Sequence, residues 1–276
     1  MTATIALPVL AALFAWWFAT GAILYLDGLP RSTYRHSMMS ASLLALLALV
    51  GLAVTSRHAT PAGAYLAFVC GIVVWAWQEM AFLMGFLTGP RKHSCPPGCR
   101  GWRHFLHGVH AILHHELALI AGGVLVFALT LDGTNQVGAW TYLALWVMRQ
   151  SAKLNLFLGV RNLGESLLPE HLHYLKGYFR RRAMNPLLPI SVIGSGGLAA
   201  LLAWTALVPG VEPFQVTAQL LLATLLGLAA LEHLFLVLPV PMDALWKWGK
   251  KSRQREPATS LASPCHTAAI PVKVEP

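Results

Sequence analysis

The segment HGVHAILHHE, which begins at His107, places four histidines and one glutamate within ten positions. His107, His110 and His114 follow an i, i+3, i+7 spacing, so they share one face of a helix, and His115 and Glu116 lie to the side of that face. Imidazole and carboxylate groups together bind iron or zinc when a helical bundle brings them close. The uncharged run that follows predicts that this chemistry is carried into a membrane-spanning helix.

Three interpretations of this histidine segment stay open. The spacing from His110 to His115 resembles one histidine box of membrane desaturases, which hold two irons with several such boxes. Only His171-x-His173 and Glu232-His233 add to it here. A histidine in a lipid-facing helix can also bind the magnesium of a chlorin, and His107 and His110 can simply be interfacial. The predicted ligands for a metal are Glu79, His110, His114, His115, Glu116, Glu232 and His233.

The composition indicates which elements position these residues. Of the 276 residues, 56% are hydrophobic and 11% charged, which is typical of a polytopic membrane protein and too apolar for an ordinary soluble domain. The net charge of +9 comes from basic residues in short loops between apolar runs. The positive-inside rule explains that pattern, so we predict no nucleic-acid partner.

Apolar stretches predict an all-α fold of about seven transmembrane helices in a single domain over residues 1–250. Residues 251–276 are basic and then rich in Pro, Ala, Ser and Thr, which predicts a disordered cytoplasmic tail. The expected spans are 5–26, 38–55, 62–87, 107–131, 137–160, 186–207 and 214–240.

Seven spans put the two termini on opposite sides of the membrane. The loops near 27–37, 88–106 and 161–185 and the C-terminal tail carry nearly all the basic residues, whereas the other side holds only Arg57. We therefore predict a bacterial cytoplasmic-membrane protein with a cytoplasmic C-terminus and an outside N-terminus.

Charged and polar residues on four of these spans fall at one depth, roughly 8–16 Å inside the cytoplasmic boundary at the rise of an α-helix. Intramembrane charges are expensive and mark functional sites by default. The competing interpretation is a salt-bridge network that only fixes helix packing. The predicted polar layer consists of Glu79, His114, His115, Glu116, Arg149, Lys153, Asn155, Glu232 and His233.

The loop RKHSCPPGCRGWRHFLH contains Cys95 and Cys99 between His93 and His104, a set that offers four ligands for zinc. The spacing is not that of a standard zinc finger, and Pro-Pro-Gly between the cysteines forces a turn by itself. We therefore interpret the loop as a constrained basic turn in preference to a zinc site.

The segment after the fifth span predicts an amphipathic helix on the cytoplasmic side. Pro169 ends one helix, Glu170 begins the next, and an apolar stripe alternates with basic residues. Such a helix binds an anionic membrane surface or a partner. Its apolar stripe is Leu172, Leu175, Tyr178 and Phe179, and its basic residues are Lys176, Arg180, Arg181 and Arg182.

Three stretches, WAWQEMAFLMGFLTGPRK, HAILHHELALI and NLFLGVRNLGESLLPEHLHYL, resemble the PuhE family. Its members are polytopic membrane proteins of photosynthetic purple bacteria, described as photosynthetic complex assembly proteins. The resemblance covers the chain from the first predicted helix to the seventh. It implies a role in reaction centre and light-harvesting assembly and an influence on bacteriochlorophyll supply, but no catalytic residues to carry over.

Together these observations predict a non-catalytic assembly factor that binds bacteriochlorophyll or nascent subunits of the reaction centre or light-harvesting complexes. The alternative is a membrane metalloenzyme that uses iron on a tetrapyrrole or carotenoid. A transporter with the charged layer as its ion path ranks last, because the sequence shows no inverted repeat.

Overall fold

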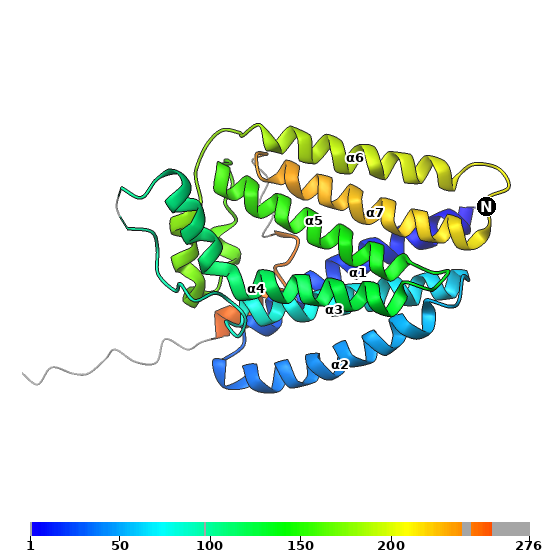
Figure 1. Ribbon diagram of the computed structural model, residues 1–276, viewed down its shortest axis with the longest axis horizontal. Coiled ribbons are helices and arrows are strands. Elements are labelled where there is room, and N and C mark those ends of the chain that lie inside the picture. Colours follow the sequence, from blue (N-terminus) through cyan, green and yellow to red (C-terminus); the bar gives the residue numbers. More distant parts are fainter. Residues whose placement is uncertain (1, 97, 239–243, 256–276) are drawn as a thin grey trace, which may run out of the picture.

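The computed structural model describes residues 2–96, 98–238 and 244–255. It contains seven long helices that run back and forth along one axis (Figure 1). Six of them are long and apolar enough to cross a membrane; α5, which carries Arg149 and Lys153, is not among the six. The helices are α1 Thr2–Asp27, α2 Tyr34–Thr55, α3 Pro61–Leu83, α4 Gly101–Thr130, α5 Val137–Leu158, α6 Leu187–Ala206 and α7 Pro213–Phe235.

The helix α3 forms the centre of the bundle. Of its most apolar 18-residue window 67% is buried, against 11% for α6. Its first turn is fixed by Thr60, whose hydroxyl accepts the Gly63 N–H at 3.1 Å, and by Pro61 at the first helical position. On α2 and α6, in contrast, most of the large apolar side chains are exposed, as expected for surfaces that face lipid.

Two apolar cores lie on either side of α3. One joins it to α1, α5 and α7 around Phe68, Leu221 and Leu225. The other joins it to α2, α4 and α5 around Leu52 and Tyr142. The described part of the chain contains no strand; its backbone pairing outside helices includes one isolated bridge between Val160 and Arg181.

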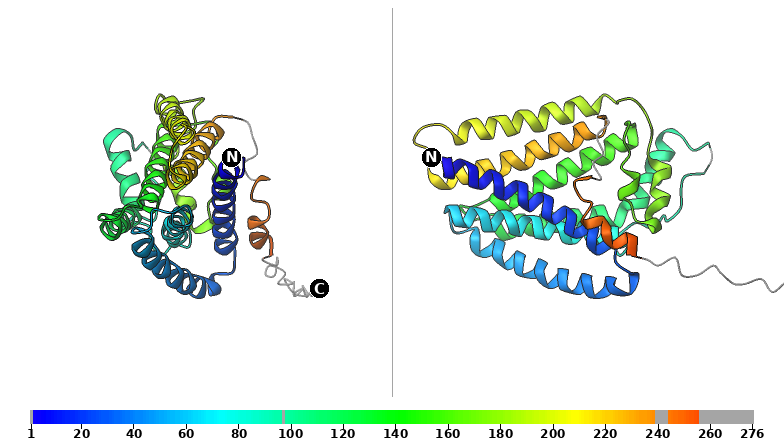
Figure 2. Two further views of the ribbon diagram at one scale, coloured as in Figure 1. Left: turned by 90° about the vertical axis from the view of Figure 1, so that its right-hand side faces the viewer. Right: turned by 180° about the vertical axis from the view of Figure 1, so that it is seen from behind.

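The loops 28–33, 84–100 and 159–186 lie at the same end of the bundle as the described C-terminal segment, and the N-terminus lies at the other end (Figures 1 and 2). The arrangement groups the basic loops at one end, as the sequence predicts. Residues 251–255 belong to the 3-10 helix η5, Gly249–Arg255; the remainder of the predicted tail, 256–276, lies outside the described residues.

The predicted amphipathic segment forms the 3-10 helix η3, Glu170–Tyr178. Its apolar stripe faces inward: Leu172, Leu175 and Tyr178 are buried and pack with Phe82 of α3 and Ala111 of α4. The prediction that this stripe lies on a membrane surface is therefore wrong. The stripe packs against apolar side chains of α3 and α4 instead.

Candidate functional site

A cavity of about 600 Å³ opens within the bundle between α1, α3, α4, α5 and α7, and the segment 162–168 and η3 close one of its ends. Most of its lining is apolar, and every one of these helices contributes apolar side chains. Six acidic, basic or histidine side chains from four helices interrupt this lining: Glu79, Glu116, Arg149, Lys153, Glu232 and His233.

A charged group at the cavity wall links α3, α4 and α5. Arg149 Nη2 lies 2.9 Å from Glu79 Oε2, and the Glu79 side chain is 8% exposed. Lys153 Nζ lies 2.6 Å from Glu116 Oε1, and the Gln150 amide donates to the other oxygen of Glu116. Two carboxylates on α3 and α4 are thus each paired with a cation on α5, which lets a helix with two basic residues lie inside an apolar bundle.

Several buried polar atoms in this group have no hydrogen-bond partner. They are Glu79 Oε1, Arg149 Nε and both ring nitrogens of His115. His115 is fully buried, and its Nε2 lies 3.6 Å from Glu79 Oε1, beyond hydrogen-bonding distance. Buried polar atoms are nearly always satisfied in folded proteins, so a cluster of unsatisfied ones beside a cavity indicates a place for water or a polar ligand.

Glu232 of α7 differs from the other two cavity carboxylates. Among the described residues no Lys, Arg or His nitrogen pairs with it. Its Oε1 instead accepts the indole N–H of Trp16 on α1 at 2.9 Å. Trp16 does not stand out in the sequence as a site residue, because an indole in an apolar helix usually packs in a core or at the membrane interface.

Asn155 and His233, two further residues of the predicted polar layer, belong to a neutral network between α5, α6 and α7. His233 Nε2 lies 2.9 Å from Ser151 Oγ, and Ser151 Oγ lies 2.7 Å from Ser191 Oγ. Asn155 contacts Ser191 at 3.2 Å and accepts from the Asn185 amide at 3.0 Å. Polar links of this kind hold membrane helices together, so Asn155 and His233 serve packing in this structure.

The structure does not bring the seven predicted metal ligands together. His110 and His114 are exposed on the outer face of α4, while His115, one position later, points into the bundle. Because successive helical residues point about 100° apart, one helix cannot turn all three inward. Within the described residues, the cluster of three ligand groups close enough for one ion is Cys95, Cys99 and His107.

A second cavity, of about 690 Å³, lies between α5, α6 and α7, and none of its lining residues is charged or a histidine. Its polar groups come from hydroxyl and amide side chains such as Ser151, Ser191 and Gln219. The charged cavity is therefore the better candidate for a functional site.

The basic residues predicted as a docking surface lie in the segment between α5 and α6, at the end of the bundle where the basic loops gather. The side chains of Arg180, Arg181 and Arg182 are exposed, and Arg181 forms a loose pair with Glu165 at 3.5 Å. Their backbone is extended, since the Arg182 N–H donates to Val160 O at 3.1 Å and the Val160 N–H donates to Arg180 O. Lys176 is half-buried on η3.

Comparison with known proteins decides the family. Residues 1–257 match the family described as "Protein of unknown function (DUF3623)". The chain belongs to this family. A relative from Rhodobacter capsulatus, the "Uncharacterized 30.4 kDa protein in puhA 5'region", is 36% identical over 263 residues, which cover 94% of this chain and 95% of the relative. No solved structure matches.

Proposed function

We propose that this DUF3623 protein is a membrane-bound assembly factor for photosynthetic reaction centre or light-harvesting complexes, and that its charged cavity binds bacteriochlorophyll during assembly. The observation that carries the proposal is the cavity of about 600 Å³ with its apolar lining and its few titratable groups. Cavities of roughly 300–1,000 Å³ with this character bind small molecules and cofactors.

The chemistry of the lining fits such a pigment. A bacteriochlorophyll is a large apolar ring with a central magnesium and a few carbonyl groups at its edge. Leu225, Phe82 and Phe157 present apolar surface for a ring, and Arg149 and Lys153 present donors for carbonyl oxygens. Magnesium prefers oxygen ligands.

Glu232 is the residue best suited to a polar ligand. Its side chain lines the cavity, accepts the Trp16 indole N–H and forms no ion pair among the described residues. His233 also lines the cavity, but its two ring nitrogens contact Ala229 O and Ser151 Oγ, so they are already engaged.

Two further observations support the photosynthetic context. The Rhodobacter capsulatus relative is named for its place in the 5' region of puhA. The three stretches that resemble the PuhE family also supply much of the site: Glu79 and Phe82 lie in the first, Glu116 in the second, and Asn162 in the third.

The partners that we propose are the lipid bilayer and subunits of the photosynthetic complexes. The exposed Arg180, Arg181 and Arg182 lie at the basic end of the bundle. Each basic residue near an anionic leaflet contributes about 1 kcal/mol of binding. We assign this end to the cytoplasmic side, where such residues contact an anionic leaflet or an acidic subunit.

The test compares Glu232→Gln with wild type in the native host lacking the gene. Glutamine keeps the size of the side chain and its bond from Trp16 but is a poorer ligand for a hard cation. Because Glu232 forms no ion pair among the described residues, the variant leaves no cation without its direct partner. We expect normal abundance in the membrane, a lower yield of photosynthetic complexes and less co-purified pigment.

The matched control is Glu165→Gln, which removes a carboxylate at the exposed pair with Arg181. Three further variants complete the series: Glu79→Gln, Glu116→Gln and His115→Ala. Glu79→Gln also removes the ion-pair partner of Arg149, and Glu116→Gln removes that of Lys153. Normal abundance together with normal complex yield in Glu232→Gln and in these three variants would refute the proposed function. Their pigment content separates a pigment-binding factor from one that binds only protein subunits.

A further inference from the structure

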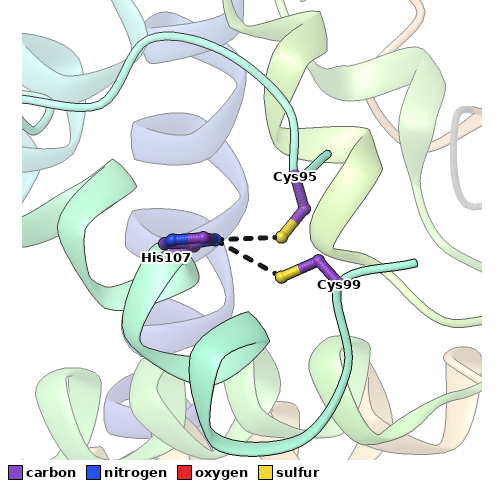
Figure 3. Close-up of side chains that lie close together, drawn as sticks. All are labelled: Cys95, Cys99 and His107. Atoms are coloured by element: carbon purple, nitrogen blue, oxygen red, sulfur yellow. Dashed lines mark hydrogen bonds between the residues drawn. The ribbon is translucent and has the colours of Figure 1, made fainter. Parts of the chain in front are cut away.

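Two thiols and one imidazole meet outside the cavity, at the beginning of α4. His107 Nδ1 lies 3.1 Å from Cys95 Sγ and 3.4 Å from Cys99 Sγ (Figure 3). All three ligand atoms lie within 4.8 Å of one another, and each residue is half-buried. Both thiols point at the same ring nitrogen, so the three groups enclose a common point.

The loop that carries the thiols is held in place before any ligand binds. Arg91 Nε donates to the Tyr178 hydroxyl at 2.7 Å, and that hydroxyl donates to His93 O at 2.9 Å. Ser94 Oγ donates to Tyr174 O at 3.0 Å. Burial raises the pKa of Tyr178 above its ordinary value, so the phenol stays protonated and keeps this donor. These bonds fix the loop to η3 directly beside Cys95.

The turn between the cysteines brings the second thiol back. Gly98 has φ +78°, a conformation that side-chain-bearing residues rarely adopt. Cys99 then lies two residues before α4, and His107 lies two turns into α4. The thiols and the imidazole thus come from two segments of fixed geometry.

We propose that Cys95, Cys99 and His107 bind a zinc ion. With Zn–S bonds of about 2.3 Å, Zn–N bonds of about 2.0 Å and tetrahedral angles, a sulfur and a nitrogen on one zinc lie about 3.5 Å apart. The observed 3.1 Å and 3.4 Å differ from this by only a few tenths of an ångström. Two thiolates neutralise the zinc charge, and thiolate with imidazole is a donor set that selects zinc over magnesium or calcium.

Three protein ligands leave the fourth tetrahedral position for water or for a donor group of a partner. The other histidines of the loop do not fill it. The His104 ring stacks on Phe157 at 5.2 Å and packs against Tyr178, and neither His104 nor His93 belongs to the cluster. The zinc therefore joins the basic loop to α4 while keeping one exchangeable position.

The experiment measures metal in the full-length protein, purified in detergent under reducing conditions from cells supplied with zinc. We expect near-stoichiometric zinc in wild type and its loss in Cys95→Ser, Cys99→Ser and His107→Gln. The matched controls are Cys70→Ala, a thiol inside the apolar core, and His110→Gln, an exposed histidine one turn further along α4. Both controls should keep the metal.

A second measurement uses wild-type protein alone, in case a ligand variant does not accumulate. The metal-free protein is titrated with cobalt, whose absorption bands report thiolate ligands and tetrahedral geometry. We expect sulfur-to-cobalt bands that zinc abolishes. Wild type without zinc and without these bands would overturn the proposal, as would a Cys95–Cys99 disulfide in wild-type protein purified without oxygen.

Discussion

Glu79 and Glu165 each pair with an arginine, but the two pairs lie in different surroundings. Glu79 is 8% exposed and its partner Arg149 is 42% exposed, whereas Arg181, the partner of Glu165, is 73% exposed. Removing one member of a buried pair costs about 3–5 kcal/mol, and an exposed pair contributes about 0–1 kcal/mol.

We therefore expect Arg149→Gln to destabilise the protein strongly, by about 3 kcal/mol, the lower end of the range for buried pairs because Arg149 is partly exposed. Arg181→Gln should change stability by less than about 1 kcal/mol. Thermal unfolding of the two variants in the same detergent measures the difference. Equal melting temperatures would mean that water in the cavity already solvates Glu79, so that the pair contributes nothing to folding.

At this scale the sequence identified the charged residues but not all of their partners. Glu79, Glu116, Arg149 and Lys153 stand out because a charge inside an apolar run is rare. Trp16 and Gln150 do not, since indole and amide groups are common in such helices and only the fold shows that they contact Glu232 and Glu116. The sequence does not single out the Cys95, Cys99 and His107 cluster, because His104 is nearer to Cys99 in the chain and only the fold shows that the His107 ring faces both thiols.

The helices themselves were well predicted, because long apolar runs between basic loops leave few alternatives. Their ends were not. The helix α3 ends at Leu83, not near residue 87, because Gly85 adopts φ +83° and the N–H groups of Phe86 and Leu87 both turn back to Ala81 O. Hydropathy does not register such a turn, since every residue in it is apolar.

The bend in α4 is also not predictable from the sequence. Figure 1 shows its first turns inclined to the rest of the helix. At this place the loop before it packs on the helix backbone: the His115 N–H donates to Thr88 O at 3.0 Å, and a Cβ on Gly89 would lie 2.1 Å from His110 O. An outside carbonyl that bonds to a helical N–H is a known cause of bending.

The crossing of α3 and α5 depends on two glycines. A Cβ on Gly71 would lie 2.8 Å from Gly138 O, and a Cβ on Gly138 would lie 2.9 Å from Ala67 O. Because both obstacles are backbone atoms, Gly71→Ala must push the helices apart, and overpacking of this kind costs about 1–3 kcal/mol. The shift would also separate Glu79 on α3 from Arg149 on α5.

The matched control is Gly197→Ala on α6, where nothing lies within 4 Å of an added Cβ. Alanine favours a helix by up to about 1 kcal/mol over glycine, so this variant should be as stable as wild type or more stable. Melting temperatures of both variants in detergent test the expectation. A stable Gly71→Ala protein would show that the α3 and α5 contact is looser than the structure has it.

For the whole molecule, the question is whether α5 crosses the membrane. It is not one of the six helices apolar enough by composition, yet it runs beside them in Figure 1 and belongs to both apolar cores. Its basic side chains pair with Glu79 and Glu116 inside the bundle, so they need not meet lipid. Internal pairing of this kind is how charged helices are accommodated in membranes.

Topology reporters decide this point. Asp132 precedes α5, and Gln254 follows α7, so three helices separate the two positions. If α5 crosses, reporters fused at these positions lie on opposite sides, and we expect Gln254 in the cytoplasm because the basic loops share its end of the bundle. A fusion at Ala59, two helices before Asp132, is the control and should match Asp132. Asp132 and Gln254 on the same side, with Ala59 still matching Asp132, would mean that α5 does not span and that the charged cavity does not lie within the membrane.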